Sequence, residues 1–364
     1  MNAIELVRSR LRNQFLHEPI SDDPADAVRW LGAVQAQDYL GTLWSIGVRT
    51  RGATELSIER TIDDRAIVRT WFMRGTLHFV AAEDYRWMIE LMGPRMRRLA
   101  TGIARTNNAE LDEAAFVEAN EVIAGALSSG GQLTREELAR ALEEAGIPAS
   151  ALRLSLLLQR AQADGLICYG PRRGKQVTHV LVDDWLPTVR SLGRDEAIAA
   201  LTKRYFQSHG PATVDDFAWW SGLPLADVRA GIASLGESFA CAEADGRTYW
   251  MPAAEPATRG ASQTAHLLWG FDEYVVAYKD RSAPFSDGNI ERAKALGGGM
   301  LRPVVVVGGR VVGNWRRKIG TRGVTVEIDY FEHTSAHDRR AIAEAAEEYA
   351  RFLGRPVTIT GRPV

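Results

Sequence analysis

The chain has 364 residues, of which 46% are hydrophobic and 25% are charged, and its formal net charge is −2 at pH 7. This composition is typical of a globular protein of roughly two to four domains and excludes a disordered chain. There is no run of eighteen apolar residues, no signal-peptide layout at the N-terminus, and only two cysteines are present. We therefore expect a cytoplasmic, reduced, monomeric protein without a membrane span, a disulfide framework or a zinc site.

The charge balance argues against a uniformly basic protein, but a local stripe of cations is enough to bind nucleic acid. Only five of the 44 cationic residues are lysine. Arginine suits bidentate contact with phosphate, although its excess also follows genomic base composition.

The N-terminal region begins with two predicted helices, an amphipathic one within residues 1–20 and a second that starts at Pro24 after a cap signal. The second helix runs into Gln35, Gln37 and Asp38, three carboxamide or carboxyl groups within four positions. By local pattern alone this cluster is a helix C-terminus whose polar side chains face water or bond to backbone carbonyls.

Residues 67–80 predict one strand with an apolar face and a polar face. Arg74, Thr76 and His78 fall together on the polar face. We expect Arg74 and His78 to meet a backbone phosphate, with a structural salt bridge as the alternative. The following helix, residues 82–104, is expected to be interrupted at Gly93-Pro94.

An order of helices followed by a hairpin recurs along the chain, in residues 111–182 and again in residues 195–250. This order is typical of a winged helix, in which one helix enters a groove and the hairpin tip meets the backbone. We expect Thr134 to cap a helix with Glu137 three residues later.

From about residue 260 the sequence predicts a β-rich module with one covering helix, residues 336–353. It includes a hairpin, residues 304–315, that turns at Gly308-Gly309. The predicted fold class is therefore α+β. The expected domains are winged helices at 1–108, 109–192 and 193–258, and a β-rich C-terminal domain at 259–364.

Metal and cofactor sites are not predicted. His333 and His337 have i, i+4 spacing, but Ser335 is an expected N-cap that places His333 before the helix. Residues 297–299, three glycines, lack both the P-loop lysine and the dinucleotide fingerprint and predict a loop. There is no Gly-x-Ser-x-Gly elbow, and neither cysteine has cationic neighbours that would activate it.

Nucleic-acid binding is the remaining interpretation, with a solvated surface as the alternative for each basic cluster. Trp219 and Trp220 are expected in the core rather than as stacking platforms. The residues expected to contact DNA are Arg74, His78, Arg95, Arg97, Arg98, Arg172, Arg173, Lys175, Arg316, Arg317 and Lys318.

Four blocks of sequence resemble the AlkZ/YcaQ family of winged-helix DNA glycosylases. The resemblance implies three tandem winged helices and a barrel-like C-terminal domain, forming a C shape around double-stranded DNA in the nucleoid. It also implies excision of bulky N-alkylated purines, and in some members the unhooking of interstrand cross-links. The blocks are residues 31–38 (LGAVQAQD), 73–78 (MRGTLH), 210–223 (GPAT with DFAWWSGL) and 270–281 (GFDEY with YKDR).

The resemblance assigns catalysis to Gln35 and Gln37, which match the Gln-x-Gln motif of the AlkZ branch rather than the Gln-x-Asp of the YcaQ branch. The AlkZ branch includes self-resistance enzymes against DNA-alkylating natural products. Asp38 either adds negative charge to the site or caps backbone. The alternative to a glycosylase is a non-catalytic winged-helix regulator, or a drug-sequestering resistance protein; a third is a family member without activity.

Glutamine has no useful pKa near neutrality and cannot be a strong general base. An N7-alkylated guanine already carries positive charge, so its departure needs no general acid. Two carboxamide oxygens would then hold a water beneath the sugar C1′. Residues i and i+2 lie about 200° apart on a helix, so both glutamines can serve one water only if the helix from Pro24 ends at or before Gln35 and both side chains turn into the concave face. A regular helix through both residues, or burial of either one away from the cleft, would reject the catalytic assignment.

Overall fold

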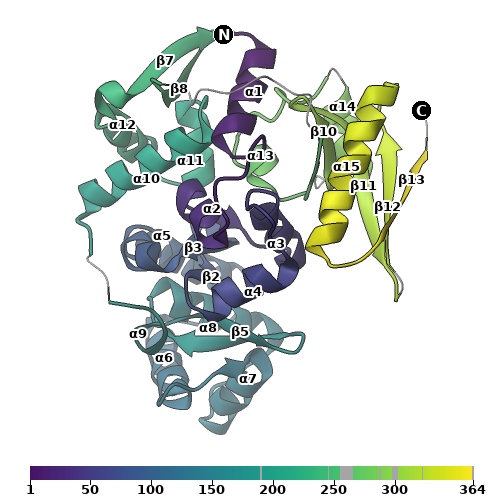
Figure 1. Ribbon diagram of the computed structural model, residues 1–364. Coiled ribbons are helices and arrows are strands. Elements are labelled where there is room, and N and C mark those ends of the chain that lie inside the picture. Colours follow the sequence, from purple (N-terminus) through teal and green to yellow (C-terminus); the bar gives the residue numbers. More distant parts are fainter. Residues whose placement is uncertain are drawn as a thin grey trace. The chain divides into compact units, whose positions relative to one another are not determined.

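The structure is a computed structural model that describes residues 1–188, 191–244, 246–254, 265–286, 288–296, 302–321 and 323–362. The chain forms two compact parts (Figure 1). Met1–Ile58 and Ile198–Val364 make up the discontinuous part, and Glu59–Ala197 makes up the continuous part. Residues 297–299, predicted as a glycine loop, lie outside the described residues. The four domain boundaries expected from the sequence stay predictions.

The continuous part holds a mainly antiparallel sheet in the order β3-β2-β5-β6-β4, surrounded by helices. Its elements are α4 (Glu55–Asp63, which begins before the division), β2 (Ile67–Trp71), β3 (Leu77–Ala81), α5 (Tyr85–Thr106), α6 (Glu113–Leu127), β4 (Leu133–Thr134), α7 (Arg135–Glu144), α8 (Ala151–Ala163), β5 (Ile167–Arg173), β6 (Gln176–Leu181) and α9 (Val182–Trp185).

The segment from α6 to β6 follows the order helix, strand, helix, helix, hairpin. The predicted capping box is confirmed: the Thr134 side chain accepts from the Glu137 N–H, and the Glu137 side chain accepts from the Thr134 N–H. This cap starts α7 with Leu138 and Leu142 facing inward, one turn apart and fully buried in a core shared with α6 and α8.

Two expectations for this part are wrong. Residues 67–80 are not one strand but the hairpin β2–β3, because Arg74 (φ 56°) and Gly75 (φ 72°) reverse the chain in a 3₁₀ turn. His78 pairs with Thr70 across the hairpin and is fully buried, so it does not share an exposed face with Arg74. Helix α5 continues through Pro94; the exposed proline ring is accommodated at the loss of one backbone hydrogen bond.

The discontinuous part combines N-terminal helices with a five-stranded sheet. Its elements are α1 (Ala3–Asn13), α2 (Pro24–Leu31), β1 (Val34–Gln35), α3 (Tyr39–Gly47), α10 (Arg194–His209), α11 (Val214–Ser221), α12 (Leu225–Ala233), β7 (Phe239–Ala244), β8 (Arg247–Pro252), β9 (Ala265–Leu268), α13 (Glu273–Val276), α14 (Asn289–Leu296), β10 (Val304–Val307), β11 (Arg310–Ile319), β12 (Val324–Tyr330), α15 (Ala336–Phe352) and β13 (Val357–Arg362).

The five strands run in the order β13-β12-β11-β10-β9, antiparallel except for β12 and β13. The predicted turn at Gly308-Gly309 is confirmed, and both glycines have positive φ, which a two-residue hairpin of this kind requires. Helix α15 covers one face (Figure 1), where Tyr349 packs edge-to-face on Trp315. Within the described residues the sheet is open, so the expected barrel-like closure is not confirmed.

Ser335 caps α15 by accepting from the Asp338 N–H, as predicted, and His333 precedes the helix. In the part of the chain that the structure describes, no helix is long and apolar enough to cross a bilayer. No three His, Cys, Asp or Glu side chains gather there in a way that would hold a metal ion.

Arg49, two residues after α3, joins three elements of the discontinuous part. Its guanidinium donates to both carboxylate oxygens of Asp272 (2.7 and 2.8 Å), to the carbonyl and side-chain oxygens of Gln14, and to the Ser45 carbonyl. The side chains of Arg49 and Asp272 are 1% and 0% exposed. A charge so far from water is tolerable only because each donor has an acceptor.

We expect Arg49→Met to lower the free energy of unfolding by roughly 3–5 kcal/mol, because it leaves the Asp272 carboxylate buried without its cation. Urea unfolding followed by tryptophan fluorescence measures the change. The control is Arg51→Met, which removes the exposed ion pair with Asp22 and should cost less than about 1 kcal/mol. Equal losses in the two variants would contradict the structural role of the buried pair.

Candidate active site

The glutamine motif lies outside any helix. Helix α2 ends at Leu31, and Gly32 closes it with φ 79° and an N–H donated to the Val28 carbonyl. The chain is then extended through Gln35 and begins α3 at Tyr39. The requirement that the helix stop before Gln35 is therefore met, and the requirement that both side chains turn into the concave face stays a prediction. Gln35 is buried, at 7% exposure, whereas Gln37 is exposed.

Asp38 is the N-cap of α3 and its carboxylate accepts from the Gly41 N–H (3.0 Å). The Thr42 hydroxyl, one turn into this helix, lies 2.9 Å from the Gln35 carbonyl and 2.7 Å from the Asp38 carbonyl. Of the two roles that the sequence left open for Asp38, the capping role is observed. A catalytic role for it stays a prediction.

A buried carboxylate holds the motif from across the chain. The backbone N–H of Gln35 donates to Oε1 of Glu273 (2.8 Å), the first residue of α13. Oε2 of the same carboxylate accepts from the indole Nε1 of Trp220 (2.9 Å) and lies 3.5 Å from Nε2 of His209. Glu273 is 1% exposed and both aromatic partners are fully buried.

Three of the four blocks of sequence that carried the resemblance meet in this region. Besides the contacts of Glu273, the Asp216 carboxylate accepts from the backbone N–H groups of Thr213 and Lys279 (2.9 Å each). The Tyr278 hydroxyl donates to the His209 carbonyl (2.8 Å). Residues 210–223 and 270–281 thus form one framework around the motif segment, and the fourth block, residues 73–78, belongs to the continuous part.

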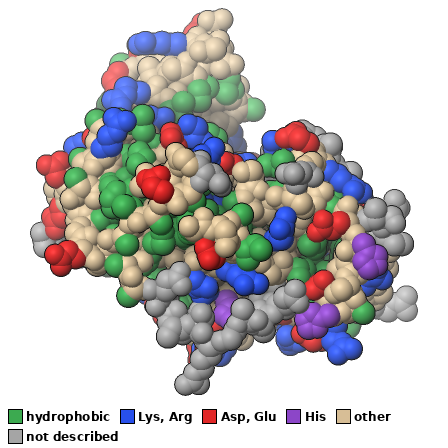
Figure 2. Space-filling view, turned by 90° about the horizontal axis from the view of Figure 1, so that it is seen from above, with side chains coloured by type: hydrophobic (Ala, Val, Ile, Leu, Met, Phe, Trp, Pro, Cys, Tyr) green, Lys and Arg blue, Asp and Glu red, His purple; other side chains and the backbone are tan. Residues whose placement is uncertain are grey.

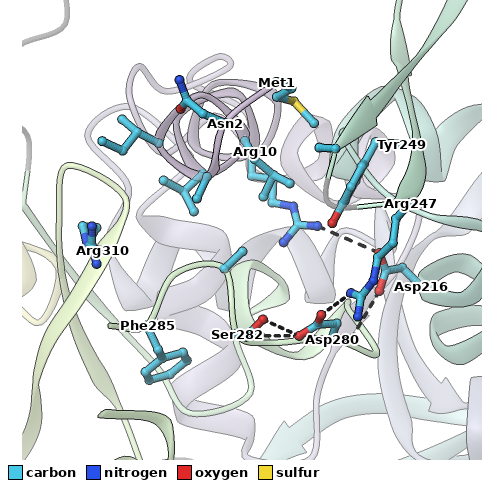
Figure 3. A pocket seen from close by; sticks show the side chains of 16 residues that line it. Met1, Asn2, Arg10, Asp216, Arg247, Tyr249, Asp280, Ser282, Phe285 and Arg310 are labelled. Atoms are coloured by element: carbon cyan, nitrogen blue, oxygen red, sulfur yellow. Dashed lines mark hydrogen bonds and ion pairs between the residues drawn. The ribbon is translucent and has the colours of Figure 1, made fainter. Parts of the chain in front are cut away.

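A separate cavity of about 380 Å³ lies beside α1 and the β7–β8 hairpin (Figure 3). Arg10 lies over the Tyr278 ring, 3.5 Å from its centroid, and its Nε donates to the Pro211 carbonyl (3.0 Å). Arg247 and Asp280 form an ion pair at the same cavity. None of the predicted site residues lines it, so we do not place the active site there.

In the continuous part, the expected DNA contacts lie on α5 and on the β5–β6 hairpin. Arg95 and Arg98 are exposed on α5, and Arg97 lies 3.4 Å from Asp164. A shallow groove along this helix is lined by four arginines, three of which belong to the basic run from Arg95 to Arg105 that the sequence indicates, while Arg160 lies outside that run. The four are Arg97, Arg98, Arg105 and Arg160.

The β5–β6 hairpin carries three of the expected cations, Arg172, Arg173 and Lys175. Within the described residues, Lys175 at the turn is exposed and has no ion pair. Arg172 is paired with Glu59, and Arg173 donates to Glu137 (2.8 Å). Both arginines therefore have structural partners, whereas the sequence had left only DNA contact or a solvated surface open for them. Arg74 is half-buried in the β2–β3 turn, while the burial of His78 removes it from any surface that meets a phosphate.

In the discontinuous part, the basic residues of β11 lie along the strand and not at a hairpin tip as expected. Arg316 and Lys318 both pair with Glu327 of β12. Arg317 contacts the Tyr349 hydroxyl and lies 4.7 Å from the Trp269 ring centroid. Figure 2 shows a similar mixture on one face of the molecule, where cations and carboxylates are interspersed.

A profile of the family described as "DNA glycosylase AlkZ-like" matches residues 28–352. The chain belongs to the AlkZ-like DNA glycosylase family. An "Interstrand DNA cross-link repair glycosylase" of Streptomyces sahachiroi is 28% identical over 325 residues, 84% of this chain and 85% of the relative. The solved structure of "Streptomyces sahachiroi DNA glycosylase AlkZ" superposes with a TM-score of 0.77 at 25% identity, covering 99% and 100% of the two chains.

The family assignment confirms the resemblance and the mixed α+β fold, and it identifies the protein as a DNA glycosylase. Sequence reasoning missed the site's inner residues. Glu273 lay inside a block used for recognition but received no role, and His209 was not selected. Trp220 is buried, as expected, but its indole bonds to the site; Trp219 is 42% exposed, contrary to the expectation of a core residue.

Buried histidines give this AlkZ-like protein a pH-dependent stability. Burial lowers the pKa of His209, and it lowers the pKa of His179 in the continuous part and of His266 in the discontinuous part to about 4. At pH 7 the lowered pKa values leave His179 and His266 neutral in the folded protein, whereas histidine in the unfolded chain, with a pKa of about 6.5, takes up a proton at higher pH.

Because the folded pKa lies below the unfolded value, their stabilisation is complete above about pH 6.5 and is lost as the pH falls toward 4. Each of His179 and His266 should therefore cost roughly 2 kcal/mol at pH 5 relative to pH 7. Urea unfolding at both pH values should show a shallower dependence in His179→Gln and in His266→Gln. The exposed His337→Gln is the control and should keep the wild-type dependence.

Proposed function

We propose that this protein is a monofunctional DNA glycosylase that hydrolyses the N-glycosidic bond of bulky N7-alkylguanine-type adducts in double-stranded DNA. Interstrand cross-links made through such adducts are included among its substrates. The observation that carries the proposal is the Gln35-x-Gln37 motif, placed outside helical geometry and held by a buried framework in a chain of the AlkZ-like family. The similarity to the interstrand DNA cross-link repair glycosylase of Streptomyces sahachiroi supports the cross-link substrate.

In the proposed reaction, water attacks the sugar C1′ while the bond from C1′ to N9 breaks. The electron pair of that bond moves to the purine and neutralises its positive charge, and the water gives its proton to solvent. The carboxamide oxygens of Gln35 and Gln37 accept hydrogen bonds from this water, orient it and stabilise positive charge on the sugar. The products are the alkylated base and an abasic site, and no lysine is required as a Schiff-base nucleophile.

We propose that winged-helix units bind the DNA and that the protein acts as a monomer. Residues 113–181 support this with their order of helix, strand, helix, helix and hairpin, as do residues 194–252 with three helices and a hairpin. The exposed cations on α5 and at the β5–β6 turn are the proposed phosphate contacts. Wherever a cation is already paired with a carboxylate, DNA has to compete with that ion pair.

We expect Gln35→Ala and Gln37→Ala each to slow excision by roughly 10²–10³-fold, the usual loss when one group that stabilises developing charge is removed. The measurement is release of N7-alkylguanine from an alkylated duplex under single-turnover conditions. The matched control is Gln207→Ala, a half-buried glutamine on α10 outside the motif, which should excise at the wild-type rate.

Undiminished release by Gln35→Ala/Gln37→Ala would reject the assigned site, and no release by the wild type would reject the reaction. If the protein were instead a non-catalytic regulator, two different results would be expected. Sedimentation would then show a dimer, and titration would show strong preference for one DNA sequence over random DNA.

We expect Arg98→Ala and Lys175→Ala to weaken binding to undamaged duplexes regardless of sequence. Each lost phosphate contact should reduce the slope of log affinity against log salt by about 0.9. Fluorescence anisotropy over a range of salt concentrations measures the slope. Lys294→Ala on α14, whose amine pairs with Glu291, is the charge-matched control, and an equal reduction in that variant would remove the site-specific interpretation.

A further inference from the structure

Glu273 is a buried carboxylate that the proposed reaction does not use. It is 1% exposed, and its two oxygens are directed to different elements. Oε1 accepts from the backbone N–H of Gln35 (2.8 Å), and Oε2 accepts from the Trp220 indole on α11 (2.9 Å). A rotation of the carboxylate that kept one of these bonds would lose the other, so the pair fixes its orientation.

The carboxylate is itself held in place. Its neighbour Asp272 is the N-cap of α13, accepts from the Tyr274 N–H and forms the buried bidentate pair with Arg49. The Tyr274 hydroxyl donates to the Gly309 carbonyl at the β10–β11 turn (2.6 Å). Glu273 therefore reaches Gln35 from a short helix whose residues on either side of it, Asp272 and Tyr274, are both bonded to neighbouring elements.

Trp220 touches the same segment of chain from a second direction. The Trp220 ring lies 3.8 Å from where a Cβ on Gly32 would be, and the Arg204 side chain lies 3.6 Å from that point. Gly32 ends α2 and starts the extended run toward the motif. The indole that bonds to Glu273 thus also borders the start of the motif segment.

Glu273 holds the backbone nitrogen of Gln35, which is bonded to the Cα atom from which the Gln35 side chain branches. On the other side of the same residue, the Gln35 carbonyl lies 2.9 Å from the Thr42 hydroxyl. Both main-chain polar groups of Gln35 thus lie within hydrogen-bond distance of side chains, although the carbonyl shares the single Thr42 hydroxyl proton with the Asp38 carbonyl. Misplacement of a reacting group by about 1 Å is sufficient to cost on the order of 10² in rate, so fixing this backbone matters for presenting the carboxamide to water.

We propose that Glu273 is a positioning residue for Gln35. Its carboxylate fixes the main chain of the Gln-x-Gln segment and thereby sets where the Gln35 carboxamide holds the attacking water. This inference rests on the catalytic role proposed for Gln35. Glu273 itself touches neither substrate nor water in this role.

A carboxylate suits this position because the Gln35 N–H and the Trp220 N–H are both donors, one to each oxygen, while the His209 ring lies 3.5 Å from the oxygen that accepts from Trp220. A glutamine at this position keeps one oxygen for a single donor and turns an NH₂ group toward the other, which places donor against donor. Replacing the Trp220 indole with a phenyl ring removes one of the two donors. The amide oxygen can then serve the Gln35 N–H while its nitrogen faces a hydrocarbon ring.

The experiment compares Glu273→Gln, Trp220→Phe and Glu273→Gln/Trp220→Phe on an alkylated duplex. Single-turnover excision rate, DNA affinity and Tm are measured for each. We expect Glu273→Gln to slow excision by roughly 10–100-fold with affinity within about threefold of wild type. The double variant should excise faster than Glu273→Gln, because the amide regains a compatible orientation.

A matched control is the buried pair of Asp84 and Trp87 in the continuous part, where the Trp87 indole donates to the Asp84 carboxylate (3.0 Å). Asp84→Asn and Trp87→Phe likewise remove a buried hydrogen bond between a carboxylate and an indole. They should lower Tm and leave the excision rate on bound DNA unchanged.

An excision rate of Glu273→Gln equal to the wild-type rate would overturn the proposal. So would a double variant no faster than Glu273→Gln, since a general loss of packing would then account for the defect. Gln35→Ala separates the two levels of inference. If Gln35→Ala excises normally, the proposed site fails and the role of Glu273 fails with it; if Gln35→Ala is slow and Glu273→Gln is not, only the positioning role is rejected.

Discussion

The guanidinium of Arg49 has to find acceptors for its donors inside the protein, since almost none of it reaches water. The acceptors are supplied by Gln14 near α1, Ser45 in α3 and Asp272 at the start of α13. A buried charge has few alternative arrangements of comparable energy, because any shift leaves a donor or a carboxylate unpaired. The relative placement of these three elements is consequently fixed. Glu273 directly follows Asp272 in the chain, so its position depends on the same pairing.

Local signals in the sequence were sufficient for much of the fold. The capping box at Thr134, the cap at Ser335 and the glycine turn at Gly308-Gly309 all act within a few residues, so a pattern of spacing reveals them. The end of α2 before Gln35 was derived from a chemical requirement and is found in the structure. Family membership came from blocks of residues and needed no geometry.

The failures have a common origin in interactions that spacing does not encode. Alternation of side-chain type cannot distinguish one long strand from two strands joined by a tight turn, and Arg74 adopts the positive φ that makes the turn. Burial of His78 and pairing of the hairpin arginines depend on which elements meet. The contact between Gln35 and Glu273 spans 238 positions, and no local pattern predicts it. Closure of a sheet is likewise a tertiary property.

The division of the chain into a discontinuous and a continuous part also affects when the contact between Gln35 and Glu273 can form during synthesis. Synthesis delivers Gln35 early and Glu273 only 238 positions later, with the whole continuous part in between. At a synthesis rate of about 5–20 residues per second, Glu273 is added roughly 10–50 s after Gln35. The continuous part, made of one uninterrupted stretch, has all of its residues before then. A nascent chain therefore contains every residue of the continuous part before it contains Glu273, and the contact between Glu273 and Gln35 can form only when most of the protein exists.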